Sequence, residues 1–384
     1  MTDNQIKLLL YSLGIILIIW VAWKFLKFFV EIAWKGLCDM FHRYNPILVI
    51  GYIFFLFPIA ACHIMILGWL DESDDIAIES EEIEEDKPIT PINEELNSKI
   101  KASKSKNVKK LLALNACDGC DLSGENLSKF ELRDASIQNA DLSRANLSST
   151  ELFSATLFKS NLNNANLEGV DLTFADCREV QFKNANLRYG DLNEANLENA
   201  NFENANLEGV NLENANLNGA NLENANLEGA FLSGASFEKA ILINANLSSS
   251  EIGLANFNSA NLHKAKLNSL KVGWRYENNS SILTSFKNAD LSEVEFMQSN
   301  LTRVKFEGAN LNKANFSGSD LPQSNFTNSN LSKANLTGVI LSNANFTNAN
   351  LEDANFTDSN LRDANINEAI LSNTITPWGI ENEN

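Results

Sequence analysis

An apolar residue recurs every five positions along most of this 384-residue chain. The run opens with Leu122, Leu127, Leu132 and Ile137. From Ala135 onward a small residue, usually Ala, stands two positions before most of the central residues. An α-helix repeats every 3.6 residues and a strand every two, so neither a helical bundle nor an ordinary sheet has this period. A short extended segment followed by a turn fits it, because residues two apart in an extended segment point to the same side.

Four five-residue units that each turn the chain through about a right angle close a square coil of 20 residues. Stacked coils pair their backbones about 4.8 Å apart, and neighbouring coils bury each other's apolar faces. The residue between Ala and Leu points outward, and Gly or Asn at the end of the unit tolerates the turn. We therefore predict an all-β rod of about 12 coils over residues 115–376.

The repeated units read ANLEG, ANLEN, ANFEN, ADLSR and ANFTD. They resemble the pentapeptide-repeat family, whose motif is A(D/N)LXX, over about residues 118–374. The resemblance implies a right-handed quadrilateral β-helix. It also brings in one known activity, since some proteins of this family protect DNA gyrase with an acidic rod of about duplex width.

The repeat loses its register once, in residues 271–285. Central residues have numbers ending in 2 or 7 up to Val272 and in 1 or 6 from Phe286 to Leu371. Since Leu267 and Phe286 are 19 residues apart, the sequence predicts a coil that is one residue short at this point.

Residues 1–70 contain two apolar runs, from about Leu8 to Trp23 and from Pro46 to Leu70. A membrane-spanning helix needs about 20 such residues. No small-residue cleavage site follows the first run, which argues against a signal peptide. A buried helix of a soluble domain is the alternative, but the rest of the chain offers little apolar surface to cover it. We predict an α-helical two-span membrane hairpin.

The loop between the two runs is basic, with Lys24, Lys27, Lys35 and Arg43. The positive-inside rule places such a loop in the cytoplasm, and both the N-terminus and the repeat domain then lie outside. We therefore expect a multi-pass protein of a bacterial plasma membrane, integral to the lipid bilayer, with the repeat domain on the extracytoplasmic side.

Residues 71–114 have the composition of a linker. Asp71 to Asp86 carries ten acids and no base, so we expect this part to stay extended by self-repulsion. A Lys-rich helix is predicted between Asn93 and Leu114, and the alternative is that its Lys run binds lipid headgroups or the acidic half. The side chains predicted to cover the first coil are Leu111, Leu112 and Leu114.

Cys117 and Cys120 form a CxxC pair, a pattern that indicates redox chemistry in soluble oxidoreductases. Both fall on inward positions of the repeat, as Cys177 does, so we interpret them as small core residues rather than a disulfide framework. Trp378, in the tail 377–384, is predicted to cover the last coil. Without a cover, the strand edges of that coil could pair with another molecule.

Four outward acids are the first candidates for contact with a partner: Glu203, Glu208, Glu223 and Glu228. The coil period places Glu203 beside Glu223 and Glu208 beside Glu228. Stacked like charges are destabilising, so we predict a cation or counter-charge as partner. A solvated face with splayed side chains is the alternative.

Three residues of the interruption, Trp274, Arg275 and Tyr276, are the second candidates. Aromatic residues and Arg dominate interaction hot spots, and here they stand in the one segment that breaks the repeat. The alternative is a bulge whose Trp folds back over the rod.

The sequence shows no nucleophile–base pair, no phosphate-binding loop and only three His, so we predict no enzymatic activity, no cofactor and no metal site. The net charge of −19 argues against general attraction to nucleic acid. The expected function is a membrane-anchored interaction or scaffold module for an unidentified protein partner, with the oligomeric state open. A filler or envelope-assembly role is not separated from this one.

The alternative function is an acidic DNA mimic that acts on a DNA-binding enzyme such as gyrase. The predicted hairpin, the extracytoplasmic orientation and the lack of a C-terminal dimerisation helix all count against it.

Overall fold

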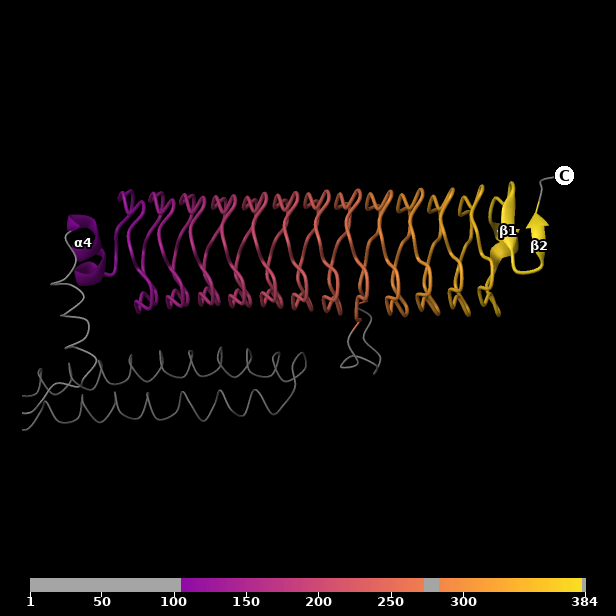
Figure 1. Cartoon of the computed structure of the whole chain (residues 1–384), viewed down its shortest axis with the longest axis horizontal. Coiled ribbons are helices and arrows are strands. Elements are labelled where there is room, and N and C mark those ends of the chain that lie inside the picture. The colour runs from indigo at the N-terminus through magenta and orange to yellow at the C-terminus, as the bar shows by residue number, and fades with distance from the viewer. Residues whose placement is uncertain (1–104, 273–282, 382–384) are drawn as a thin grey trace, which may run out of the picture. The chain divides into compact units, whose positions relative to one another are not determined.

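The computed structural model describes residues 105–272 and 283–381. In these ranges the chain is a stack of coils, with helix α4 at the start of the stack and strands β1 and β2 at its end (Figure 1). The two predicted membrane spans and the acidic part of the linker lie outside the described residues. Of the described residues, none belongs to a helix long and apolar enough to cross a membrane.

Each five-residue unit contributes one parallel β-bridge to the next coil. Asp121 pairs with Asp141, and Asn126 pairs with Asn146, so each residue pairs with the one four units further along the chain. The backbone N–H of Leu122 donates to the carbonyl of Asp141 at 2.7 Å. This ladder confirms the predicted β-helix, while its handedness and the number of its coils stay predictions.

Two features of the turn explain the residues around each central position. The residue two after the centre adopts a left-handed conformation, as at Asn204 with φ 58°, which Asn and Gly tolerate better than other residues. The Asn just before the central residue accepts a hydrogen bond from the backbone N–H just after the central residue. Asn201 Oδ1, for example, accepts from the N–H of Glu203 at 3.0 Å. Where Asn or Asp precedes the centre, the motif therefore encodes an Asx turn at that corner.

The core of the stack consists of the central residues and the small residues that precede them. Leu212 and Phe306 are fully buried at central positions, and Ala215 is 1% exposed at a small position. The predicted inward direction of both positions is confirmed. Because each coil is only one side chain deep, its apolar area is buried by the coils above and below.

Stacked Asn side chains form a second ladder on the outside. Asn146 Nδ2 donates to Asn126 Oδ1 at 3.2 Å, and Asn166 and Asn186 continue the column at 3.2 and 3.0 Å. The amide groups thus satisfy one another along the stack, as in other in-register β-structures.

The prediction of a coil one residue short was wrong. Phe286 stacks on Phe257, with ring centroids 4.8 Å apart, and not on Leu267. Leu267 instead donates its backbone N–H to Glu295 O at 2.7 Å. Phe286 therefore stands two units earlier in the stack than its spacing from Leu267 indicates, and Phe296 is the central residue that follows Leu267 in its column.

The interruption is an insertion of nine residues into one coil. Across it, the N–H of Lys287 donates to Asn258 Oδ1 with a sequence separation of 29. The equivalent bond in an uninterrupted coil, from the N–H of Lys183 to Asn163 Oδ1, has a separation of 20. The two separations differ by nine. Sequence spacing alone could not show which coil accommodates the extra residues.

Helix α4, Lys106–Leu114, covers the first coil. Its N-cap Ser105 accepts a hydrogen bond from the N–H of Val108, whose side chain is buried with that of Leu111. Leu112 is partly buried, as predicted, but Leu114 is 66% exposed and does not cover the coil. The helical period explains this difference, because Val108 and Leu111 share one face and Leu114 lies past its edge.

The last coil ends in a short 3₁₀ turn, η2 (Ile366–Glu368), and a hairpin of β1 (Thr374–Thr376) and β2 (Gly379–Glu381). Ile375 of β1 pairs with Asn355 of the preceding coil on one side and with Ile380 of β2 on the other. Strand β2 covers this edge, whereas Trp378 is 61% exposed. The prediction that the Trp378 side chain covers the end was therefore wrong.

Candidate protein-binding surface

The four candidate glutamates lie on two neighbouring faces of the stack. Glu203 and Glu223 occupy the same position in successive coils, because Asn204 N donates to Glu223 O. Glu208 and Glu228 are related in the same way through Gly209. The predicted alignment is correct.

A basic residue precedes each glutamate pair in its column. Lys183 Nζ lies 2.8 Å from a carboxylate oxygen of Glu203, and Arg188 Nη2 lies 2.8 Å from one of Glu208. The hydrogen bond to Glu208 raises the pKa of Arg188 above its ordinary value, so the guanidinium stays charged. The predicted counter-charge for the first glutamate of each column is thus supplied by the rod itself.

The second glutamate of each column has no ion-pair partner among the described residues. Glu228 accepts a hydrogen bond from Asn246 Nδ2 at 3.1 Å, and the backbone of Glu223 is held by Asn221. A neutral amide does not cancel a carboxylate charge. Of the four candidate glutamates, Glu223 and Glu228 are therefore the two whose charge remains available to a partner.

Beside these columns lies an exposed tyrosine that the sequence analysis missed. Tyr189 is 57% exposed and adopts φ 55°, a left-handed conformation that is unusual for a bulky residue. The Arg188 guanidinium lies 4.9 Å from the ring centroid, and its Nη2 donates to the Tyr189 hydroxyl at 2.9 Å. The ring covers Gly209, where a Cβ would lie 2.7 Å from Tyr189 Cδ1.

A second exposed aromatic group lies on another corner of the stack. Phe174 is 49% exposed, has φ 59°, and meets Phe153 edge-on with ring centroids 5.5 Å apart. Arg178 lies 5.3 Å from the ring centroid of the nearby Phe158 and pairs with Asp176. The sequence signal for Phe174 and Tyr189 was an aromatic side chain at the turn position, where the repeat mostly uses Asn, Gly or another polar residue.

Trp274, Arg275 and Tyr276 lie outside the described residues, so their role stays a prediction. Their insertion point is defined by its flanks, Val272 and Thr284, which belong to consecutive faces of one coil. Within the described ranges, no group of three or more His, Cys, Asp or Glu is arranged to hold a metal ion.

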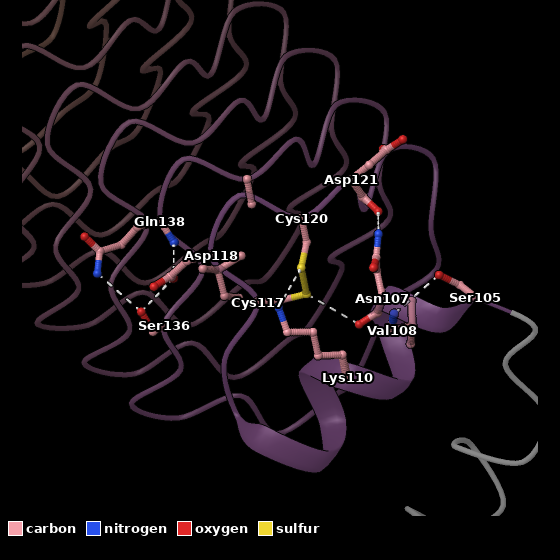
Figure 2. Close-up of a disulfide and its surroundings, with 12 residues drawn as sticks. Ser105, Asn107, Val108, Lys110, Cys117, Asp118, Cys120, Asp121, Ser136 and Gln138 are labelled. Carbon is pink, nitrogen blue, oxygen red and sulfur yellow. Dashed lines mark hydrogen bonds between the residues drawn. A yellow bond between two sulfur atoms is a disulfide. The ribbon is translucent and has the colours of Figure 1, made fainter.

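The two cysteines of the CxxC pair are buried, as predicted, but they are also bonded to each other (Figure 2). Cys117 is fully buried and Cys120 is 8% exposed. The interpretation as simple core residues was therefore incomplete. Cys177 is a free thiol in the core, and burial raises its pKa.

Two family models match the repeat region. One, described as pentapeptide repeats, matches in eight copies over residues 117–148, 215–251, 283–318, 309–348 and 340–375. The other, described as a pentapeptide repeat region, matches residues 155–232. Together they cover more than half of the chain. No curated protein matches it.

Several solved structures are similar to the chain. HetL, a pentapeptide repeat protein involved in heterocyst differentiation regulation in the cyanobacterium Nostoc, is 24% identical, with 73% of this chain and 100% of HetL covered and a TM-score of 0.25. Rfr23 from the cyanobacterium Cyanothece is 31% identical, with 39% and 95% covered and a TM-score of 0.16.

QnrB1, a plasmid-mediated fluoroquinolone resistance protein, is 16% identical, with 62% of this chain and 88% of QnrB1 covered and a TM-score of 0.22. The assignment rests on the family models and on the regular β-ladder of five-residue units in the structure. The chain belongs to the pentapeptide-repeat family.

Proposed function

We propose that the chain is a membrane-anchored, non-catalytic rod that binds a protein partner through exposed aromatic corners. The observation that carries this proposal is the pair Phe174 and Tyr189, both exposed and both in the left-handed conformation. A non-glycine residue in that conformation costs about 1–2 kcal/mol. Since about half of each residue is exposed, burial offsets only part of that cost.

The left-handed conformation is shared by the turn positions of the repeat, and what distinguishes Phe174 and Tyr189 is a bulky, exposed aromatic side chain in that conformation. Tyr189 and Phe174 have the chemistry of interface residues, because aromatic rings and Arg contribute most to binding energy. The Arg188 guanidinium beside Tyr189 and the acids Glu223 and Glu228 provide charge at the edge of the same region. Trp274, Arg275 and Tyr276 stay candidates for contact with the partner on their residue types alone.

The membrane part of the proposal rests on the two apolar runs of residues 1–70 and on the basic loop between them. An extracytoplasmic repeat domain is supported by the Cys117–Cys120 disulfide, because disulfides persist in oxidising compartments and are rare in the cytosol.

We do not propose that the rod mimics DNA. A mimic of a phosphate backbone needs an uninterrupted row of negative charge, and Lys183 and Arg188 stand in line with the glutamates and neutralise the first of each pair.

The test of binding is site-directed photo-crosslinking in cells. A photoreactive phenylalanine analogue at position 174 or 189 should crosslink to a defined protein, whereas the same analogue at Asn244, a turn position with φ 58° on another corner, should not. The double variant F174N/Y189N should lose co-purification of that protein while its thermal stability is unchanged or higher. Equal crosslinking at all three positions, or a partner retained by the double variant, would contradict the proposed surface.

Anchoring and orientation have a separate readout. Alkaline phosphatase fused after Asn384 should be active in a membrane fraction, and a fluorescent protein that matures only in the cytoplasm should stay dark. The reverse pattern would place the rod in the cytoplasm, and recovery in the soluble fraction would rule out the anchor.

A further inference from the structure

The disulfide of the first coil lies beside helix α4, and two groups of that helix contact its sulfur atoms (Figure 2). Lys110 Nζ lies 3.7 Å from Cys120 Sγ, and the carbonyl oxygen of Asn107 lies 3.5 Å from Cys117 Sγ. These contacts are independent of the partner-binding function proposed above.

Neither contact is a strong hydrogen bond while the disulfide is intact. A bonded sulfur has no hydrogen to donate to the Asn107 carbonyl, and it is only a weak acceptor for an ammonium group. After reduction, a Cys117 thiol can donate to that carbonyl, and a Cys120 thiolate can pair with Lys110. The helix therefore presents one group suited to a thiol and one suited to a thiolate.

Other contacts hold α4 in place whatever the state of the sulfurs. Val108 and Leu111 are buried against the coil, and Asn107 Nδ2 donates to Asp121 O at 2.8 Å. On the other side of the pair, Asp118 accepts hydrogen bonds from Ser136 Oγ at 2.7 Å and from the N–H of Gln138 at 2.9 Å. The helix backbone that carries Lys110 and the Asn107 carbonyl is thus held in place independently of the state of the sulfurs.

We propose that Cys117 and Cys120 form a thiol–disulfide exchange site, in which Cys120 is the sulfur that reacts with an external dithiol or disulfide and Lys110 stabilises its thiolate. Accessibility supports the same assignment, because Cys120 is 8% exposed and Cys117 is fully buried. In CxxC sites, thiolate character and access decide which sulfur reacts.

The exchange is a two-electron reaction with an external dithiol as reductant. One thiolate of the dithiol attacks Cys120 Sγ, the bond between the two cysteines breaks, and Cys117 leaves as a thiolate that takes up a proton. The second thiol of the dithiol loses its proton and attacks the sulfur that is bonded to Cys120. This step releases Cys120 as a thiolate beside Lys110 and the dithiol as a cyclic disulfide. In the reverse direction the Cys120 thiolate attacks an external disulfide.

The test uses the full chain in detergent micelles, with dithiothreitol as the reductant. After reduction, the alkylation rate of each cysteine is followed by peptide mass spectrometry between pH 5 and 9, and Cys177 serves as an internal buried control. Cys120 should react faster than Cys117 at pH 7, with circular dichroism unchanged by reduction.

Lys110→Gln should slow alkylation of Cys120 at pH 7 by up to about tenfold, because the loss of the ammonium reduces the thiolate fraction. The same variant should shift the dithiothreitol ratio at half-reduction toward stronger reductant. Lys109→Gln, an exposed neighbour on the same helix, should change neither value.

Three outcomes would overturn the proposal: equal alkylation of Cys117 and Cys120, a Lys110→Gln variant with the wild-type pH profile, or a disulfide that dithiothreitol reduces only when the rod unfolds. The last outcome would show that the Cys117–Cys120 disulfide serves only to stabilise the first coil.

Discussion

The coils before the interruption and the coils after it have the same backbone but fill their cores differently. Before residue 272 most central residues are Leu. After it, Phe and Leu alternate from Phe286 to Phe326. Since successive units form successive sides of the coil, alternation places the Phe columns on opposite sides. Phe306 stacks on Phe286 and Phe326 at 5.4 and 5.0 Å, and it meets Phe296 and Phe316 edge-on across the core at 5.9 Å.

The backbone ladder therefore depends on the five-residue period of the sequence and only weakly on which apolar side chain fills the core. The Phe columns even cross the interruption, because Phe257 stacks on Phe286 although the inserted residues lie between them in the chain. A nine-residue insertion at one corner therefore leaves the columns intact.

The largest effect should come from changing the length of the insertion. Asn256 pairs with Ser285 across the interruption. Removal of nine residues, 274–282, restores the regular spacing of this pair, and the rod should keep its stability within about 1 kcal/mol. Removal of ten residues, 273–282, leaves one coil a residue short. It should destabilise the second segment by more than about 4 kcal/mol, since a one-residue slip turns inward positions outward.

Guanidinium denaturation followed by circular dichroism measures both deletions. If the ten-residue deletion proved as stable as the nine-residue deletion, the assignment of Ser285 opposite Asn256 would be wrong.

The next largest effect compares the two cores. Phe306→Ala should cost about 3–5 kcal/mol, and Leu212→Ala, in the first segment, should cost about 1 kcal/mol less. The extra loss reflects the four ring contacts of Phe306, because an aromatic pair contributes about 0.5–1.5 kcal/mol beyond its buried area. Denaturant midpoints of the two variants, each checked for an unchanged slope, give the comparison. A larger loss for Leu212→Ala would show that the aromatic columns add nothing.

A smaller effect is expected at the Asn ladder, which is longest in the first segment. Asn186→Ala removes the hydrogen bond to Asn166 and should cost about 0.5–1.5 kcal/mol. Asn350→Ala removes the equivalent bond to Asn330 in the second segment and should cost the same, because Asn186 and Asn350 each also accept one backbone N–H, from Arg188 and from Glu352. Glu168→Ala, an exposed position, serves as the control and should stay within about 0.5 kcal/mol. Thermal unfolding of the three variants tests whether the ladder contributes equally in both segments.

The smallest effect is expected in the pH dependence of the free energy of unfolding. It is measured for two ion pairs: Arg178–Asp176 lies within one coil, and Lys264–Glu293 spans the interruption. The side-chain hydrogen bond from Arg178 lowers the pKa of Asp176. Burial raises the pKa of Glu293, but the charges of Lys264 and Lys313 and the hydrogen bond from Lys313 outweigh it, so the pKa is lowered. A carboxyl with a lowered folded pKa stabilises the protein above its unfolded pKa, about 4, and this contribution is lost as the pH falls through the folded value.

Stability measured between pH 6 and pH 2.5 should therefore fall less in Asp176→Asn and in Glu293→Gln than in the wild type. For Asp176, which is partly exposed, the difference should be at most about 1 kcal/mol and should shrink in high salt. A difference that appears above pH 6 would point to another group.

Much of the candidate surface could not be predicted from sequence. The alignment of Glu203 with Glu223 followed from the period alone. Lys183 and Arg188 stand one coil before the acids they neutralise, and these ion pairs depend on the direction in which long side chains extend from one coil to the next. Phe174 and Tyr189 were visible as departures from the turn pattern. Their significance came from exposure and from the left-handed backbone, neither of which the sequence states.

The sequence by itself determined the coil, because a five-residue period with Ala and Leu two apart permits few other ways to bury those side chains. It also determined which residues point inward, down to the cysteines of the first coil. Only the tertiary structure decided where the nine inserted residues fit, which side chains of α4 cover the first coil, and that Cys117 and Cys120 meet beside Lys110. The physical reason is that the five-residue period determines locally whether each side chain points inward or outward. Contacts between coils, and between a coil and its cap, join residues far apart in sequence, and their distances are defined only in the folded stack.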